Sequence, residues 1–186
     1  MLRIACIGSR ELSPEAISIC KKLGRWIVEC GHHIYSGNAY GADAAFAYGG
    51  NLVDTESVHL MLPWASYNRD QIVEGNQILT VEGLGVGAKA YYSGLGKKYH
   101  PRYDTLSQGA QKLHFRNGMI LQPGKTLENP PNPFSVDVCF AYPKPGMNMG
   151  GTGQGIRIAK GEGIPCVLIG TLNQQELAQL CDKIAG

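Results

Sequence analysis

The stretch Ile4-Ala5-Cys6-Ile7-Gly8-Ser9-Arg10 opens the chain with an apolar run that ends in a glycine turn. Ser13-Pro14-Glu15 follows, which is typical of a helix N-terminus: a capping hydroxyl, a proline at the first helical position and an acid in the first turn. Apolar residues then recur at helical spacing up to Val28, and residues 33–35 form a second apolar run. A strand, a helix and a second strand in this order predict a parallel sheet.

The same alternation continues along the chain. Apolar runs predict further strands at residues 58–62, 136–141 and 166–169. Helices are predicted at residues 42–48 and after Asn173, which has a glutamate three residues later as in a capping box. The expected fold class is therefore α/β: a Rossmann-like, doubly wound, mainly parallel sheet of five or six strands with helices on both faces. We expect residues 1–186 to form a single domain.

Residues 64–113 do not fit this alternation. They hold scattered glycines and a patch in which tyrosines are interleaved with cations, namely Tyr91, Tyr92, Tyr99 and Tyr103 with Lys89, Lys97, Lys98 and Arg102. We interpret the segment as a central insertion that acts as a lid or a partner contact, because long stretches without regular structure are uncommon in compact domains unless they are functional. A single-strand binding surface is the alternative for the tyrosine patch.

Composition excludes several classes of protein. The 186 residues carry a formal net charge of +2, which does not suit a strongly basic nucleic-acid coat. The six cysteines lie far apart, mostly within apolar runs, and are expected to be buried thiols in a reducing compartment. With neither a signal peptide nor a membrane-spanning apolar run, a cytoplasmic protein is expected. The histidines have no metal-ligand spacing, so we expect no metal and no cofactor.

Glycines cluster with small polar residues where predicted strands lead into helices. Gly8-Ser9-Arg10 follows the first strand, residues 36–43 (SGNAYGAD) follow the second, and residues 146–155 (GMNMGGTGQG) follow the strand at 136–141. The carboxyl ends of parallel strands meet at one edge of a sheet, where backbone N–H groups can approach a phosphate. Neither the dinucleotide fingerprint nor a P-loop is present. We therefore predict a phosphate-binding edge without the usual NAD or ATP motif.

The first two junctions also have purely structural explanations. Gly8-Ser9-Arg10 can be a plain strand-to-helix turn, with Arg10 free to make a bidentate contact if a phosphate is present. Asp43 falls in the first turn of the second helix, where the helix dipole favours a carboxylate. Contact with a ribose hydroxyl or a base edge is the functional alternative for Asp43.

The glycine segment at residues 36–43, with the alanines at 44, 45 and 47, resembles the S-G-G-A-x-G-[IA]-D-x-x-A signature of the DNA-processing protein A (DprA/Smf) group. That group belongs to the SLOG superfamily of Rossmann-like nucleotide-binding domains. Residues 115–120 (FRNGMI) resemble its R-N-x-x-I element, and residues 137–169 resemble the closing unit G-G-T…A…G-I-P-V. His100-Pro101-Arg102-Tyr103 is similar to a feature of short phage-encoded relatives.

The resemblance implies binding of a nucleotide or nucleotide-derived small molecule, or of single-stranded DNA, by a homo-oligomer with a role in DNA processing or nucleotide sensing. The chain is too short for the flanking domains of full-length DprA. The ligand-binding residues expected from the junctions and the resemblance together are Gly8, Ser9, Arg10, Ser36, Gly37, Asn38, Gly41, Asp43, Arg116, Asn117, Gly150, Gly151 and Thr152.

Whether the protein is an enzyme stays open at this point. The superfamily also contains the LOG "lysine decarboxylase-like" phosphoribohydrolases, which carry P-G-G-x-G-T-x-x-E and use its glutamate to cleave a nucleotide N-glycosidic bond. Arg157 stands where that glutamate is expected, which leaves Asp43 and Glu74 as candidates for a catalytic carboxylate. The alternatives to simple phosphate binding are thus an N-glycosidic-bond hydrolase or transferase and a non-catalytic protein that sequesters a nucleotide-derived signal.

Overall fold

The computed structural model describes residues 1–126, 135–144 and 150–185. Within them the strands are β1 (Arg3–Gly8), β2 (His33–Ser36), β3 (Val58–Leu62), β4 (Gln77–Thr80), β5 (Val138–Tyr142) and β6 (Cys166–Leu168). The helices are α1 (Pro14–Glu29), α2 (Ala42–Asn51), α3 (Val86–Tyr99), α4 (Gln108–Leu121), α5 (Gly150–Gly161) and α6 (Gln174–Ala185). Short 3-10 helices occur at Arg69–Gln71, Tyr103–Thr105, Pro123–Thr126 and Ile169–Thr171.

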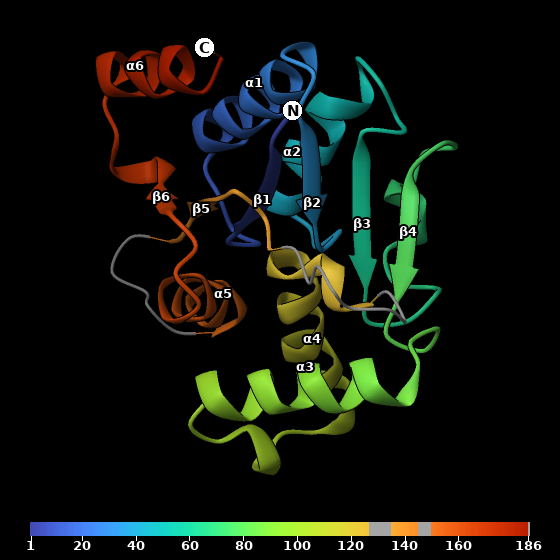
Figure 1. Ribbon diagram of the computed structural model, residues 1–186. Coiled ribbons are helices and arrows are strands. Elements are labelled where there is room, and N and C mark those ends of the chain that lie inside the picture. Colours follow the sequence, from blue (N-terminus) through green and yellow to red (C-terminus); the bar gives the residue numbers. More distant parts are fainter. Residues whose placement is uncertain (127–134, 145–149, 186) are drawn as a thin grey trace.

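The six strands form one parallel sheet in the order β4-β3-β2-β1-β5-β6, with β4 at one edge and β6 at the other (Figure 1). The chain first adds strands on one side of β1 and then returns to place β5 on the other side. The order of the strands therefore reverses between β1 and β5, which is the topological switch point where open α/β sheets bind ligands. The expectation of a Rossmann-like α/β fold is confirmed.

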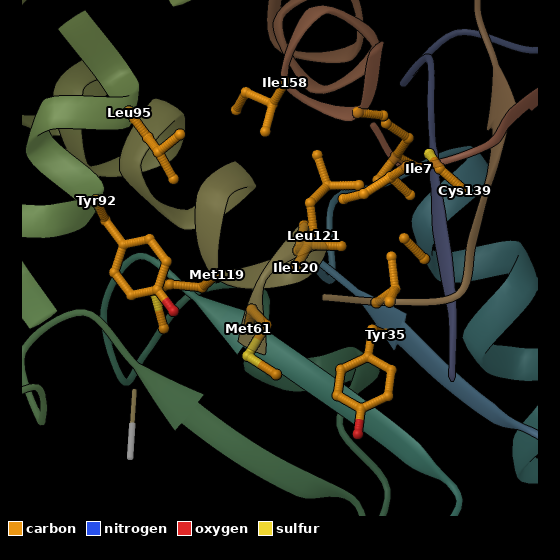
Figure 2. Close-up of a cluster of buried hydrophobic side chains, with 14 of the residues drawn as sticks. Ile7, Tyr35, Met61, Tyr92, Leu95, Met119, Ile120, Leu121, Cys139 and Ile158 are labelled. Atoms are coloured by element: carbon orange, nitrogen blue, oxygen red, sulfur yellow. The ribbon is translucent and has the colours of Figure 1, made fainter. Parts of the chain in front are cut away.

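Alternate residues of each central strand face opposite layers of helices. Ile4 and Cys6 of β1 pack with α1, α2 and α6, while Ala5 and Ile7 pack with α3, α4 and α5. Figure 2 shows the second layer, where Tyr92 of α3 and Met119 of α4 lie among side chains of the sheet. Both faces of the central strands are covered, which explains why β1, β3 and β5 read as continuous apolar runs.

The predicted helix caps are present. The Ser13 side chain accepts a hydrogen bond from Ala16 N at 3.2 Å and begins α1. Asn173 and Glu176 form a reciprocal capping box at the start of α6. Asn173 N donates to Glu176 Oε2 at 2.8 Å, and Glu176 N donates to Asn173 Oδ1 at 2.9 Å. None of the helices in the described ranges is both long and apolar enough to span a bilayer.

The expectation that residues 64–113 lack regular structure is wrong. This segment supplies the edge strand β4 and the helix α3, and it contains the first part of α4. Its helix α3 is anchored by Tyr92 and Leu95, which are buried against α4 and the sheet. The alternation of strand and helix thus continues through the middle of the chain, with α3 and α4 in the described part of the connection from β4 to β5.

Candidate functional site

A cavity of about 420 Å³ lies at the switch point of the sheet. Its walls come from the loop after β1, the residues after β5, one side of α4 and the beginning of α5. The lining residues are Ile7, Gly8, Ser9, Arg10, Glu11, Ala39, Asp43, Ala110, Leu113, His114, Arg116, Asn117, Lys144, Gly151 and Thr152. Eight of the residues expected from the sequence are among them: Gly8, Ser9, Arg10, Asp43, Arg116, Asn117, Gly151 and Thr152.

The pairing of β1 with β5 sets two walls of the cavity side by side. Gly8 is in register with Tyr142, and Ser9 N donates to Tyr142 O at 2.9 Å. Arg10 and Lys144 follow these strand ends, so both cations line the same cavity. Lys144 Nζ lies 2.8 Å from Glu11 Oε2, while Arg10 Nη2 is 3.5 Å from the hydroxyl of Tyr67.

Asp43 lies at the bottom of the cavity and contacts three neighbouring groups. Its Oδ1 accepts a hydrogen bond from Gly8 N at 3.1 Å, and its Oδ2 accepts from Ala39 N at 3.4 Å and from Arg116 Nη1 at 3.2 Å. Burial raises the pKa of Asp43 above its usual value, although Arg116 and the two amides act in the opposite direction. Both carboxylate oxygens are engaged, so Asp43 holds the loops and Arg116 in place.

Three other predicted residues lie beneath the cavity and do not line it. Ser36 is fully buried and its hydroxyl donates to Cys6 O at 2.8 Å. Asn38, also fully buried, donates from Nδ2 to Tyr67 O and Asn68 O at 3.2 and 3.1 Å. A Cβ on Gly37 would fall 1.1 Å from Arg116 Nη1, so glycine is required there for the guanidinium to fit. These three residues therefore support the loops and the Arg116 side chain that line the cavity.

Gly41 fixes the approach of the second loop to the first. It has φ +84°, a left-handed conformation that favours glycine, and a Cβ there would lie 2.3 Å from Ser9 O. The close approach allows Ala42 N to donate to Ser9 O at 3.0 Å. The glycine loops after β1 and β2 therefore meet, as their places at the ends of neighbouring parallel strands predicted.

The third glycine segment differs from its prediction. The helix α5 already begins at Gly150, so Gly153 and Gly155 lie inside the helix, and residues 146–149 lie outside the described ranges. Gly150 is exposed with φ +73° and does not line the cavity. Gly151 and Thr152 belong to the first turn of α5, whose N–H groups have no intrahelical partner and carry the positive end of the helix dipole.

Arg116 and Asn117 occupy the second half of α4, not its beginning. Both are buried, at 5% and 7% exposure, so neither is a surface side chain of the helix. Asn117 Nδ2 donates to Gly151 O at 3.0 Å and to Gln154 Oε1 at 2.9 Å. The Arg-Asn pair therefore connects α4 to the loops through Arg116 and to the N-terminus of α5 through Asn117.

Sequence reasoning missed three polar residues of the cavity: Glu11, His114 and Lys144. Glu11 directly follows Gly8-Ser9-Arg10, so its place beside the first glycine junction could have predicted that it lines the site. Lys144 follows the β5 strand by two residues and could have been found from the same rule about strand ends. His114 precedes Arg116 on α4, but no local pattern marks the side of the helix on which it lies.

The carboxylates suggested for catalysis are placed as follows. Asp43 is fully engaged as described above, and Glu74 is an exposed residue that does not line the cavity. Arg157, at the position of the LOG glutamate, donates from Nε to Tyr99 O at 3.0 Å and so contacts α3. Glu11, the other carboxylate among the described lining residues, is ion-paired with Lys144. Each of these carboxylates therefore either is held by partners or lies away from the cavity.

The tyrosine patch is mostly part of the packing. Tyr92 is fully buried and Tyr103 is 5% exposed, and Tyr92 Oη donates to Gln122 O at 2.7 Å. Tyr91 is hydrogen-bonded to the Gln122 side chain, and Tyr99 Oη donates to Glu162 at 2.6 Å. These rings pack α3 against α4 and α5 and against the residues that directly follow each of those two helices. Rings that are engaged in this way do not suit the stacking of bases.

Comparison with known proteins gives a fold relationship. No protein-family model and no curated protein matches the sequence. Among solved structures, DNA processing protein A from Helicobacter pylori is similar, with a TM-score of 0.53 and 16% sequence identity over 100% of this chain and 74% of that chain. That structure is described in terms of its single-stranded DNA binding mode. The chain thus shares the fold of a DNA processing protein A.

Proposed function

We propose that the protein binds phosphate groups of single-stranded DNA in the cavity at the carboxyl ends of β1 and β5. The observation that carries the proposal is the convergence on one cavity of Arg10, Lys144 and the first turn of α5. Cations and free backbone N–H groups at a helix N-terminus are the donors that phosphate oxygens require. No acidic residue occupies the first turn of α5, so no carboxylate of that turn would repel an anion.

The charge balance around the cavity supports an anionic ligand. Asp43 is neutralised by Arg116, and Glu11 by Lys144. Arg10 and the helix dipole then leave an excess of positive potential. Arg116 Nε is buried and has no hydrogen-bond partner among the described residues, so the guanidinium is not fully satisfied by its contact with Asp43. The structural relationship to a protein with a known single-stranded DNA binding mode favours a strand as the source of the phosphate.

A mononucleotide or a nucleotide-derived signal is the second candidate, and the size of the cavity favours it. A volume of about 420 Å³ falls within the range of small-molecule sites, and the net charge of +2 suits a local contact. A sequestering role would require tight binding of the free nucleotide. A strand-binding role would require affinity that increases with the length of the oligonucleotide.

One set of titrations tests the proposal. Fluorescence anisotropy with a labelled oligothymidylate, and calorimetry with adenosine monophosphate, are run on the wild type and on Lys144→Gln. Lys22→Gln is the matched control, because Lys22 is exposed on α1 and does not line the cavity. We expect the oligonucleotide to bind, and Lys144→Gln to weaken it. Tight binding of the mononucleotide alone would favour sequestration, and folded protein that binds neither probe would refute the proposal.

A further inference from the structure

A row of amide hydrogen bonds connects the backbone of α5 to His114 in the cavity wall. Asn117 Nδ2 donates to Gly151 O at 3.0 Å and to Gln154 Oε1 at 2.9 Å. The same Gln154 Oε1 lies 2.7 Å from His114 Nδ1. Gln154 is fully buried, its Nε2 has no hydrogen-bond partner among the described residues, and the two contacts of Oε1 orient its amide.

These contacts determine which nitrogen of His114 carries a proton. A backbone carbonyl accepts hydrogen bonds only, so Gly151 O fixes the amide of Asn117 with its nitrogen toward α5. Asn117 Nδ2 then requires an oxygen from Gln154, and Gln154 Oε1 in turn requires a proton on His114 Nδ1. The ring is therefore an Nδ1–H imidazole, and Nε2 is the nitrogen that can take up a second proton.

Protonation at Nε2 leaves the hydrogen bond to Gln154 intact, since Nδ1–H donates in both states. The ring can therefore gain a positive charge without breaking the contacts that hold it. In this cavity the change adds one donor and one charge and removes nothing.

The surroundings disfavour the charged form of His114 when the cavity is empty. Burial lowers its pKa, the hydrogen bond to Gln154 opposes this, and the charges of His100, Arg157 and Arg116 lower the pKa further. His100 reaches it from the end of α3, with the two rings 4.3 Å apart. The charged groups on the other walls are Arg10, the Lys144–Glu11 pair and the Asp43 that is bound to Arg116.

We propose that His114 is a proton-linked anion contact of the cavity, which takes up a proton at Nε2 when a phosphate group binds. The inference rests on the proposed function, since it needs a phosphate in the cavity. His114 lines the same cavity as Arg10, Lys144 and Thr152, so a bound anion faces its ring. The anion supplies the negative charge that the neighbours of His114 lack, and by linkage its binding and the protonation strengthen each other.

The test needs a ligand that does not itself titrate. A short oligothymidylate with hydroxyl ends carries only phosphodiesters, which stay ionised, whereas a terminal phosphate would gain a proton near pH 6. Calorimetry in buffers of different ionisation enthalpy then counts the protons taken up on binding. For the wild type we expect an uptake approaching about one proton at a pH between the pKa of His114 in the unliganded protein and its higher pKa in the complex, and affinity that rises as pH falls by at most about tenfold per unit.

His114→Gln should still bind the oligothymidylate but take up no proton, and its affinity should be flat with pH. His100→Gln is the matched control, because His100 contacts the His114 ring but does not line the cavity. It should keep the uptake. If the uptake disappears in His100→Gln and persists in His114→Gln, the assignment to His114 is wrong.

Nuclear magnetic resonance of the wild type gives a second measurement that needs no variant. Long-range proton–nitrogen spectra of the imidazoles should show His114 as the Nδ1–H tautomer without ligand and doubly protonated with the oligothymidylate at the same pH. An Nε2–H tautomer, or a ring that stays neutral in the complex, would overturn the proposal. Absence of any binding would refute the proposed function instead, so the two failures are distinguishable.

Discussion

Arg116 Nη1 lies 3.2 Å from Asp43 Oδ2, and both side chains are 6% exposed. The pair joins α4, which belongs to one helical layer, to α2 in the other, and it does so at the bottom of the cavity. Asp43 also accepts hydrogen bonds from the amides of Gly8 and Ala39, so a single carboxylate connects both glycine loops to α4. The shape of the cavity therefore depends on this ion pair.

Replacing Asp43 with asparagine leaves the guanidinium of Arg116 buried without its counter-charge. Removal of one partner from a buried pair costs about 3 kcal/mol. We expect Asp43→Asn to lower the free energy of unfolding by about that amount in urea denaturation. The exposed pair Arg25–Glu29 on α1 provides the control, and Glu29→Gln should cost less than about 1 kcal/mol. Equal losses in the two variants would mean that the Asp43 pair has no special role in the core.

Gly37 gives a second way to break the same contact. A Cβ there would lie 1.1 Å from Arg116 Nη1 and 2.8 Å from Asp43 Oδ2, so Gly37→Ala must displace the guanidinium. We expect a loss of stability similar to that of Asp43→Asn, about 3 kcal/mol. The two changes should not add in the double variant, because both remove one interaction.

Gly94→Ala is the control for the glycine substitution. Gly94 lies in the interior of α3, is exposed, and would place its Cβ in open space. Alanine is favoured over glycine in a helix by about 0.5–1 kcal/mol, so this variant should unfold at higher urea concentration than the wild type. Opposite signs for the two substitutions in the same denaturation experiment are the expected result; destabilisation by both would contradict the explanation given for Gly37.

Sequence reasoning succeeded where a local pattern carries the information. The strand at Val58–Leu62 was predicted with its observed bounds, and the caps at Ser13 and Asn173 were found, because apolar runs and capping residues act within a few positions. The glycine loops were placed at one edge of the sheet for a similar reason. Parallel strands bring their carboxyl ends together whatever their order.

The failures concern elements whose stability comes from tertiary contacts. The strand β4 is an edge strand in which Ile78 is 47% exposed, so it has no buried apolar run to reveal it. The helix α3 contains three glycines, which weakens its intrinsic helical preference, and it depends on the burial of Tyr92. For His114, only the crossing of α4 over the sheet determines that the ring lines the cavity.

Stability at acid pH should depend on His59. Its Nε2 lies 2.9 Å from His33 Nδ1, and its ring stacks on Tyr35 with centroids 4.4 Å apart. Burial, followed by the charge of His33, lowers the pKa of His59 from its ordinary 6.5 to about 4. Between these two pH values His59 is protonated in the unfolded chain and neutral in the folded protein. The free energy of unfolding therefore decreases as pH falls from about 6.5 to about 4.

The measurement is the melting temperature across this pH range for the wild type and His59→Phe. Phenylalanine keeps a ring on Tyr35 and removes the titration, so the melting temperature of the variant should fall less steeply between about pH 6.5 and 4. Comparison at about pH 8, where the imidazole is neutral, gives the cost of the lost contact with His33. Parallel curves for the two proteins would show that another group causes the acid sensitivity.

Affinity for a single strand should respond with opposite signs to the two partners of the Lys144–Glu11 pair. Lys144 Nζ lies 2.8 Å from Glu11 Oε2, and both side chains line the cavity. Glu11→Gln frees the ammonium group for a phosphate and removes a negative charge, so affinity should increase about two- to fivefold, the range of an exposed ion pair. Lys144→Gln should weaken binding and reduce the slope of log affinity against log salt by about 0.7, the value for one phosphate contact on a single strand.

The exposed pair Lys112–Glu82, with Nζ and Oε1 3.1 Å apart, supplies the matched controls because neither residue lines the cavity. Glu82→Gln and Lys112→Gln make the same changes of net charge as the two test variants. If affinity followed net charge alone, each control would shift binding as much as its counterpart in the cavity. A local phosphate contact instead predicts that only the variants at positions 11 and 144 change the affinity for oligothymidylate and its salt dependence.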